Sequence, residues 1–405
     1  MKICLIRCPS PFLLEDKVFP PLGLMSVGTV LKRAGHDVII HDGDMVDIPM
    51  NCDAYGLGPT TPEHSYALTA LELIREQNFP TRIIIGGPHV LLKSNHYFNK
   101  ADFDCVVRGD GEPVVNTAFV SKVKSIDGGE DNSLDDYPPL DYSLINLKSY
   151  KYKLNGIPCM TMISSRGCPY HCAFCFKNYT KIRYRSVENV ISEIRDLHFT
   201  FGYNALAFPE DIFILNKKRT ETICSELKRL GIIFRCLIRA DVLIKHGLSF
   251  ARMLAESGCV EVGMGIESGS EQILKTINKG ETSSTIRKAI FMMKDVGLKV
   301  KGFFIMGLPG ESKKTIDETR RFLDEVDLDD LDIKIYQPFP GTPIWNNKDK
   351  FDIDWDKDED WSHMFYKGRP GEYYGSVRTS HLSTDLIYRE WVSMENTYKK
   401  WTYQS

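Results

Sequence analysis

Short apolar runs alternate with segments of helical periodicity along most of the sequence, and this alternation restricts the fold more than any other feature. In the first 126 residues the apolar runs lie at 2–7, 37–42, 53–58, 82–87 and 103–109, with helical segments at 20–35 and 62–77. Strands joined through helices pair in parallel, because a parallel connection needs a crossover. Residues 1–126 are therefore predicted to form an α/β, doubly wound, Rossmann-like domain.

A second run of strand and helix signals follows a linker. Residues 127–150 are rich in Asp, Gly, Pro and Ser and show no period, which indicates a connection between domains. Residues 151–340 contain six apolar runs separated by helical segments, beginning at 159–165. Six such units predict a partial (β/α)6 barrel, whose functional loops lie at the carboxyl ends of the strands.

Residues 341–405 are predicted to be an aromatic-rich C-terminal extension. Six strands do not close an eight-stranded barrel, so the extension either covers the open side or only packs its aromatic residues onto the barrel. All five tryptophans of the chain lie there: Trp345, Trp355, Trp361, Trp391 and Trp401.

Composition excludes several classes of protein. The net charge of −3 offers no broad attraction to nucleic acid or to anionic lipid. No apolar run approaches the roughly 20 residues of a membrane span, and the N-terminus resembles a strand more than a signal peptide. Eleven cysteines in such a chain indicate reduced thiols, some of them metal ligands. We expect a cytoplasmic protein without a membrane or nucleic-acid partner.

One cysteine-rich loop, "SSRGCPYHCAFCFKNY" (164–179), directly follows the first predicted barrel strand. Its cysteines, Cys168, Cys172 and Cys175, have the spacing C-x3-C-x2-C. Thiolates this close suit a cubane iron–sulfur cluster, and three ligands leave one iron open to a substrate. The alternatives are a zinc site with His171 as the fourth ligand, although His171 adjoins Cys172, or buried structural thiols.

This loop at the mouth of a six-stranded barrel resembles the radical S-adenosylmethionine (SAM) enzymes, over residues 159–340. The resemblance implies a 4Fe–4S cluster whose open iron chelates the amino and carboxylate groups of SAM. An electron from a donor such as flavodoxin or ferredoxin would pass through the cluster and cleave SAM into methionine and a 5′-deoxyadenosyl radical.

The same resemblance implies residues that contact SAM. Phe174 would lie near the adenine, and Glu210 and Asp211 of "FPEDIF" would contact the amino group, unless they form an exposed pair at a strand end. Arg239 would meet the SAM carboxylate or form a surface ion pair. Glu267 of "GIESGS" would accept hydrogen bonds from the ribose.

The segment "GFFIMGLPGE" resembles the strand of the family that binds adenine. Gly302 and Gly307 would let a flat base approach the backbone, and Ile305 would offer an apolar face. The alternative is that these glycines only mark a strand end.

The N-terminal half resembles the cobalamin-binding domain that is fused to one large branch of radical SAM enzymes. Four segments carry the resemblance: "PPLGLMSVG", "GPTTPEHSYA", "GGPHV" and "RGDGE". It implies a cobalamin site formed by Pro21, Leu22, Gly23, Thr60, Thr61, Gly86, Gly87, His89, Gly109, Gly111 and Glu112. The alternative is a doubly wound module that binds no cofactor or binds another nucleotide.

The D-x-H-x-x-G motif, whose histidine binds cobalt in many cobalamin proteins, is missing from this half. Its absence implies cobalt without that ligand. His64 is predicted to be an exposed histidine at the start of a helix.

Together the two resemblances imply a cobalamin-dependent radical SAM methyltransferase that methylates an unactivated carbon of an unknown organic substrate, through a 5′-deoxyadenosyl radical and methylcobalamin. No general base is evident. The first alternative is cyclisation or rearrangement on the same cofactors. A transfer-RNA methylthiotransferase is a second, although the N-terminal cysteines lack its cluster motif. A cobalamin or iron–sulfur protein without catalysis is a third.

Overall fold

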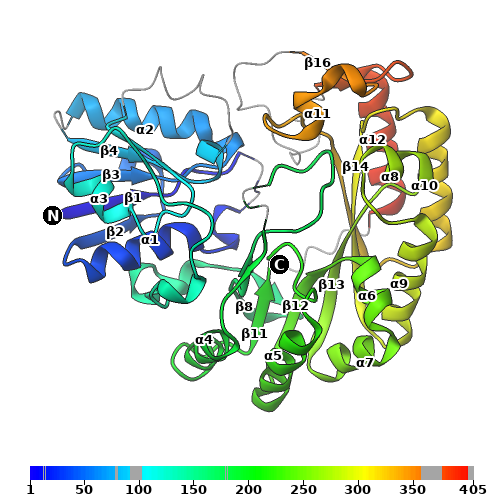
Figure 1. Cartoon of the computed structure of the whole chain (residues 1–405), viewed down its shortest axis with the longest axis horizontal. Coiled ribbons are helices and arrows are strands. Elements are labelled where there is room, and N and C mark those ends of the chain that lie inside the picture. The colour runs from blue at the N-terminus through cyan, green and yellow to red at the C-terminus, as the bar shows by residue number, and fades with distance from the viewer. Residues whose placement is uncertain are drawn as a thin grey trace. The chain divides into compact units, whose positions relative to one another are not determined.

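The structure is a computed structural model of the chain, and it describes residues 1–399 except 12, 14, 78–80, 92–102, 178, 180 and 357–375 (Figure 1). The chain divides into two compact units. Among the described residues, the first unit spans Met1–Lys151 and the second begins at Tyr152. The segment 127–150, predicted to be a linker, belongs to the first unit.

The first unit is built on a six-stranded sheet in the order β2-β1-β3-β4-β5-β6. Every neighbouring pair is parallel. The strands are β1 (Lys2–Ile6), β2 (Asp37–His41), β3 (Ala54–Leu57), β4 (Arg82–Ile85), β5 (Cys105–Arg108) and β6 (Ser125–Asp127). The first five correspond to the predicted apolar runs. β6 was not predicted, because it is short and has polar residues at both ends.

Helices cover both faces of this sheet. Figure 1 shows α1 (Leu22–Arg33) and α2 (His64–Gln77) on opposite sides, and α3 (Val115–Val120) lies against α1. Burial on both faces explains why β1 is apolar from Ile3 to Ile6. The chain leaves α1 through Gly35, whose φ of +88° suits glycine.

The segment 127–150 has little regular structure but is tied to the first unit. It forms three 3-10 turns, each started by a side chain, from Ser133, Asp141 and Asn146, that accepts a backbone N–H. The Tyr137 hydroxyl donates to Asp110 over 2.6 Å. Asp, Asn and Ser in such turns satisfy the backbone without a period.

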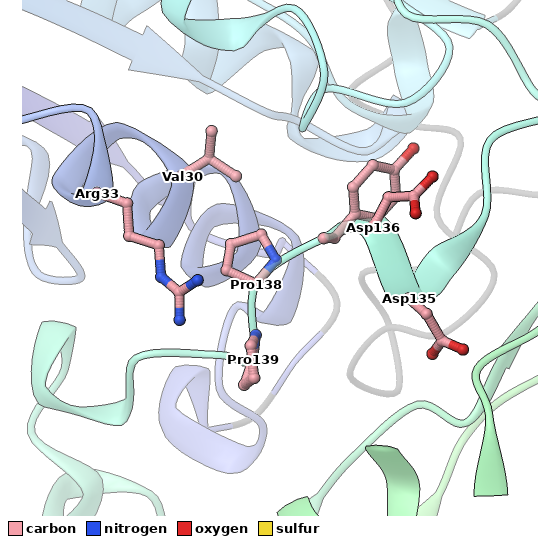
Figure 2. Close-up of a pocket in the computed structure, with 7 residues that line it drawn as sticks. Val30, Arg33, Asp135, Asp136, Pro138 and Pro139 are labelled. Atoms are coloured by element: carbon pink, nitrogen blue, oxygen red, sulfur yellow. The ribbon is translucent and has the colours of Figure 1, made fainter. Parts of the chain in front are cut away.

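A surface pocket of about 310 Å³ lies between this segment and α1. Figure 2 shows Arg33, Asp135 and Asp136 among the residues around it. Because α1 begins at the carboxyl end of β1, its last turn lies toward the opposite edge of the sheet. The pocket is therefore not at the edge where ligands of doubly wound sheets bind.

The second unit contains a seven-stranded sheet in the order β15-β14-β13-β12-β11-β8-β7. Six parallel strands follow one another in chain order: β8 (Ile157–Thr161), β11 (Ala205–Phe208), β12 (Ile233–Ile238), β13 (Cys259–Glu267), β14 (Lys299–Met306) and β15 (Asp330–Ile335). The two-residue strand β7 (Lys153–Leu154) pairs antiparallel with β8. The prediction of a partial α/β barrel is confirmed.

Helices connect the parallel strands along the outside of this sheet (Figure 1). They are α4 (Val187–Phe199), α5 (Lys217–Leu230), α6 (Ala240–His246), α7 (Leu248–Glu256), α8 (Glu271–Thr276), α9 (Ser283–Asp295) and α10 (Lys313–Glu325). The sequence did not predict α6 and α8, since helices of seven and six residues carry little periodic signal.

After β15 the chain forms α11 (Pro343–Asn346), the pair β16 (Asp354–Trp355) and β17 (Val377–Arg378), and α12 (Thr384–Tyr398). α12 lies against β15, and the indole N–H of Trp391 donates to the carbonyl of Ile333 over 2.9 Å. α12 thus lies at the edge strand of the open sheet. Trp361 and Trp401 lie outside the described residues.

No helix among the described residues has the length and apolar character needed to cross a membrane.

Candidate functional site

The cysteine loop begins where β8 ends, and its two ends are joined by a short strand pair. β9 (Ser165–Arg166) pairs antiparallel with β10 (Arg183–Tyr184). Gly167, between β9 and Cys168, has a φ of +95°, and a Cβ there would collide with the backbone oxygen of Lys181. Glycine therefore lets the two ends of the loop approach each other closely.

Glu210, at the end of β11, fixes the start of the loop. Its carboxylate accepts the backbone N–H of Ser164 (2.5 Å) and of Ser165 (3.0 Å), and the hydroxyl of Ser164 (2.7 Å). Burial raises the pKa of Glu210, whereas the bonds from Ser164 and the nearby Arg219 oppose that rise. Arg219 also donates to the Ser164 carbonyl (2.9 Å). Glu210 is thus buried, and its carboxylate is occupied by hydrogen bonds to the start of the loop.

Asp211 is the carboxylate of this pair that remains accessible. Its side chain reaches solvent, yet desolvation by the surrounding protein raises its pKa, and Lys177 opposes this. Asp211 also contributes to the raised pKa values of the Cys168 and Cys175 thiols. Of the two residues predicted to contact the SAM amino group, Asp211 is the one whose carboxylate interacts electrostatically with Cys168 and Cys175.

The middle of the loop is held by two other segments of the second unit. The N–H of Ala173 donates to the carbonyl of Ile277 (2.7 Å), and the Asn278 amide donates to the carbonyl of His171 (2.8 Å). From α11, the N–H of Ile344 donates to the carbonyl of Ala173 (3.2 Å). Contacts on both sides of the loop therefore restrict how the three cysteines are presented.

The three cysteines form a set of mutually interacting thiols. Cys172 is buried, and Cys168 and Cys175 are half-buried. Burial and, to a smaller extent, the neighbouring Cys172, Asp211, Cys168 and Glu267 together raise the pKa of Cys175 to about 12. A bound metal overcomes this rise in pKa, because a coordinating thiol is deprotonated outright. Soft thiolates on one loop suit an iron–sulfur cluster.

The zinc alternative gains no support from the geometry of His171. Its Nδ1 lies 3.3 Å from the Lys177 ammonium nitrogen, on an exposed side chain. Within the described residues, no three His, Cys, Asp or Glu side chains converge tightly enough to hold a single metal ion. A cubane cluster has no such requirement, because each thiolate binds a different iron.

Arg239 follows β12 and is buried beside Cys172. Its guanidinium stacks on the Tyr170 ring, 3.6 Å from the centroid, and its Nη1 lies 3.9 Å from the Cys172 sulfur. Its Nε pairs with Asp241 at 3.0 Å. The alternative that Arg239 forms a surface ion pair is wrong, because only 6% of the residue is exposed.

Glu267 ends β13 in an unusual backbone conformation. It is one of three described non-glycine residues with positive φ, at +65°, and the pairing of β13 with β14 shifts register between Gly265 and Glu267. Its Oε1 lies 2.9 Å from the Lys279 ammonium nitrogen. A strained residue at a strand end is often functional.

The residues predicted to contact adenine lie on two faces of β14. Ile305 shares its partly exposed face with Lys301 and Phe303, whereas Gly302 faces the buried side. A Cβ on Gly302 would lie 2.8 Å from Leu328 and 3.0 Å from Ile266 side chains. Core packing therefore accounts for Gly302, and Ile305 is the residue that can offer an apolar surface.

Two further residues predicted from the resemblance lie at turns of the second unit. Gly307 has a φ of +77°, and its N–H donates to Glu311 over 2.5 Å. Phe174 is half-buried in the turn between Cys172 and Cys175.

In the first unit, the four loops of the predicted cobalamin site meet in two pairs at the carboxyl edge of the sheet. The N–H of Gly86 donates to the Leu57 carbonyl, and the N–H of His89 to the Pro59 carbonyl. The Ser26 hydroxyl donates to Glu112 over 2.5 Å. This edge is where doubly wound sheets bind ligands, so the placement of the loops fits a bound group.

The glycines of this edge divide into two kinds. A Cβ on Gly87 would lie 2.7 Å from the backbone of Gly58, and one on Gly111 would lie 2.8 Å from Val27. Gly109 has a φ of +65°. A Cβ on Gly86 would make only ordinary contacts at 3.6 Å, and one on Gly23 would meet nothing within 4 Å. Packing within the chain accounts for the first three glycines and not for the last two.

Thr60, Thr61, Pro21 and Leu22 lie at the same edge. The backbone N–H of Thr60 donates to Glu63 over 2.8 Å, and the Thr61 hydroxyl lies 3.3 Å from His89 Nδ1. Pro21 precedes α1 and Leu22 is its first residue.

The prediction that His64 is exposed is wrong. His64 is 6% exposed and stacks on His89, with ring centroids 4.1 Å apart. The start of α2 lies beneath the loop that follows β4, which a helix-start signal cannot reveal. Burial and the neighbouring His64 lower the pKa of His89 to about 3, so His89 is neutral at physiological pH.

Sequence reasoning missed four residues that surround Cys172 and Glu267: Tyr170, Asp241, Lys279 and Glu281. The available signal was "NKGE" (278–281), two opposite charges flanking a glycine in a loop at the barrel mouth.

A sequence-family comparison matches residues 162–323 to the radical SAM superfamily. An uncharacterized methyltransferase of Pyrococcus horikoshii is 30% identical over 386 residues, covering 85% of this chain and 82% of that protein. The bacteriochlorophyllide d C-12(1)-methyltransferase of Chlorobaculum tepidum is 25% identical, covering 85% of this chain and 77% of that protein.

Among solved structures, the radical SAM methyltransferase TsrM from Kitasatospora setae, with cobalamin and a 4Fe–4S cluster bound, resembles the chain with a TM-score of 0.64. The match is 14% identical and covers 85% of this chain and 73% of TsrM, so it shows a shared fold. The chain therefore belongs to the radical SAM superfamily, and the relatives that it resembles include methyltransferases.

Proposed function

We propose that the protein is a cobalamin-dependent radical SAM methyltransferase that transfers a methyl group to an unactivated carbon of an organic substrate. One observation carries the proposal: the three thiols of the cysteine loop lie with Asp211, Arg239 and Glu267, which come from the ends of three different strands. Such convergence at a barrel mouth is how this fold builds an active site.

The residues have separate tasks in this proposal. Cys168, Cys172 and Cys175 hold the 4Fe–4S cluster. Asp211, accessible beside the cysteines, accepts hydrogen bonds from the SAM amino group. Glu267 accepts hydrogen bonds from the ribose, and Ile305 lies against the adenine, with Phe174 on the cysteine loop. Glu210 and Gly307 position the loops, because their polar groups are engaged within the chain.

Cobalamin would be held by the carboxyl edge of the first unit, formed by residues 21–23, 60–61, 86–89 and 109–112. Gly86 and Gly23 leave space there that packing within the chain does not require. When bound, the cluster would supply the electron that cleaves SAM, and cobalamin would carry the methyl group that the substrate receives. A low-potential protein such as flavodoxin or ferredoxin would deliver the electron.

Methylation is favoured over a methylthiotransferase reaction by the N-terminal cysteines. Cys4, Cys8, Cys52 and Cys105 are all buried in the first unit, and burial raises their pKa values. Cys4 and Cys105 lie within strands β1 and β5, and Cys8 and Cys52 belong to the hydrophobic core, so these four thiols pack as small apolar side chains and do not share one loop as the cluster cysteines do. The similarity to a bacteriochlorophyllide methyltransferase also favours carbon methylation.

The test uses the full chain, reconstituted without oxygen with iron, sulfide and cobalamin. The protein is incubated with a reductant, SAM carrying a deuterated methyl group, and a small-molecule extract of the host. We expect 5′-deoxyadenosine to form together with a deuterium-labelled organic product. The control is a triple variant that carries Cys168→Ala, Cys172→Ala and Cys175→Ala, and it should yield neither 5′-deoxyadenosine nor labelled product.

Two results would contradict methylation. Formation of 5′-deoxyadenosine with an altered but unlabelled product would indicate cyclisation or rearrangement. Intact SAM in the reduced wild-type sample would indicate a protein that binds its cofactors without catalysis.

A further inference from the structure

Five charged side chains form a buried network between the cysteine loop and the end of β13. They are Arg239, Asp241, Glu267, Lys279 and Glu281. Glu281 is fully buried, and the side chains of Lys279 and Arg239 are 5% and 7% exposed. Only Asp241 and Glu267, at the margins of the network, reach solvent to a greater extent, at 30% and 10%.

Glu281 occupies the centre of this network. One of its oxygens lies 3.4 Å from Arg239 Nη2 and 3.5 Å from Lys279 Nζ. The other accepts the backbone N–H of Asp241 over 2.9 Å. A buried carboxylate that faces two cations holds both in place, because moving either one would leave an unpaired charge in the protein interior.

The two cations extend the network to two different parts of the site. Lys279 lies 2.9 Å from Oε1 of Glu267, and its pKa is raised by Glu267 and Glu281 against the effect of burial. Arg239 reaches the sulfur of Cys172, and it also binds the Lys279 carbonyl over 2.9 Å. The network thus ends at a cluster ligand on one side and at the carboxylate assigned to the ribose on the other.

Stability alone does not account for this arrangement. Buried ion pairs often contribute little net stability, since desolvation offsets their attraction, and their attested role is to specify one conformation. Here the conformation specified includes the left-handed backbone of Glu267, which is otherwise unfavourable.

We propose that Lys279 and Glu281 are positioning residues that link the ribose end of the SAM site to the iron–sulfur cluster. Lys279 holds one oxygen of Glu267, so that the other oxygen faces the ribose hydroxyls. Glu281 holds Lys279 and Arg239 together, so that the charges beside Cys172 remain balanced. The inference rests on the proposed function, because it takes Glu267 to contact SAM and Cys172 to bind the cluster.

The first test measures binding by the reconstituted, oxygen-free full chain, using S-adenosylhomocysteine and its 2′-deoxy analogue as probes. The wild type should prefer the ribose form. Lys279→Met should weaken binding of S-adenosylhomocysteine about tenfold or more and remove most of the preference, as expected for a lost hydrogen bond to a charged group. Lys279→Arg keeps the charge and should retain the preference.

Lys301→Met is the matched control. Lys301 also lies between two carboxylates, Asp330 at 2.8 Å and Asp332 at 3.1 Å, but near the amino end of β14, which is the end of the strand away from the barrel mouth. This variant removes a lysine ion pair of the same kind without touching the network, and it should bind both probes as the wild type does.

The second test measures the midpoint potential of the cluster by EPR-monitored redox titration. Lys279→Met removes a positive charge within electrostatic reach of Cys172 and should lower the potential. Glu281→Gln removes a negative charge and should raise it. Opposite shifts are the signature of charge positioning, whereas general loosening of the fold would shift both variants in the same direction.

Three results would overturn the inference: unchanged discrimination in Lys279→Met, equal loss in Lys279→Arg and Lys279→Met, or potentials that move in the same direction. A wild type that binds neither SAM nor S-adenosylhomocysteine would instead contradict the proposed function. The two failures are therefore distinguishable.

Discussion

The carboxyl edges of the two parallel sheets meet the demands of binding in different ways. In the second unit, the loops present charged side chains that are paired with one another, such as Lys279 with Glu267 and Arg239 with Asp241. In the first unit, the corresponding loops present mainly glycines, prolines, threonines and a stacked pair of histidines, and their carboxylates, Glu63 and Glu112, accept hydrogen bonds from a backbone N–H and a hydroxyl group. The first pattern suits a small charged ligand, and the second suits a bulky ligand recognised by shape and backbone groups.

The largest expected effect is the loss of cofactor binding at one carboxyl edge while the other edge still binds its cofactor. Cys172→Ala should abolish the cluster and all 5′-deoxyadenosine formation, because the loss of one thiolate leaves a cluster without a full set of ligands. Cobalamin binding should persist, since the proposed cobalamin site lies in the first unit. Iron content and the corrinoid absorption band, measured on the same sample, check this.

Cys224→Ala is the control for that prediction, because Cys224 is a buried core thiol of α5. It should keep the cluster. Concurrent loss of corrinoid and iron in Cys172→Ala would show that the two edges do not bind independently.

The second expected effect distinguishes the roles of Glu210 and Asp211, two adjacent carboxylates at the carboxyl edge of the second unit. Glu210→Ala leaves the buried N–H groups of Ser164 and Ser165 without their acceptor, at a cost of about 1–3 kcal/mol each, and should reduce cluster loading. Asp211→Asn should load the cluster normally and weaken SAM binding roughly tenfold. Iron content and calorimetric SAM binding separate the two outcomes. Equal cluster loss in both variants would refute the division of roles.

The third effect tests the glycines of the first unit. Gly87→Ala should destabilise that unit by about 1–3 kcal/mol, since its φ is +85° and the new Cβ would lie 2.7 Å from the backbone of Gly58. Gly86→Ala should fold normally, because its Cβ would make only ordinary contacts, and should lose cobalamin if the cofactor occupies that space. Denaturation curves and corrinoid retention provide the measurements. Full cobalamin binding by Gly86→Ala would contradict the assignment of Gly86.

The smallest expected effect concerns acid stability. Between about pH 3 and the unfolded value of 6.5, the unfolded chain holds a proton on His89 that the folded chain lacks. Stability of the first unit should therefore fall as pH drops below 6.5, by at most about 1.4 kcal/mol per pH unit from this group. His89→Phe keeps a ring beside His64 and should reduce the slope.

Hydrogen exchange of peptides from β3 and β4 measures this slope, because all five tryptophans lie in residues 341–405 and fluorescence would not report on the first unit. An unchanged slope in His89→Phe would show that His89 is not the titrating group.

Sequence alone predicted much of this architecture. The apolar runs marked the parallel strands because buried strands are uniformly apolar, and the cysteine loop was correctly placed after β8. Residues 127–150 were predicted to be a linker but belong to the first unit, since Asp, Ser and Asn start capped turns as readily as they occur in linkers. Gly302 lies on the buried face of β14, where side chains alternate between a buried and a partly exposed face. The sequence alone did not show which of the two faces is buried.

The sequence predicted charged residues of the candidate site only where they directly follow an apolar run that marks the end of a strand. Asp211, Arg239 and Glu267 each follow an apolar run, and the structure places them near the cysteines. Lys279 and Glu281 lie beyond the end of α8, and their importance depends on contacts with Arg239 and Glu267 that are distant in sequence. The same holds for His64, whose burial depends on the loop containing His89.

The central claim is that three cysteines hold a cluster with one iron left open for SAM. Mössbauer spectroscopy of the reconstituted wild type, recorded with and without SAM, tests it most directly. The account predicts a 4Fe–4S cluster in which one iron differs from the other three and changes its signal when SAM is added. Four irons that do not respond to SAM, or zinc in place of iron, would contradict it.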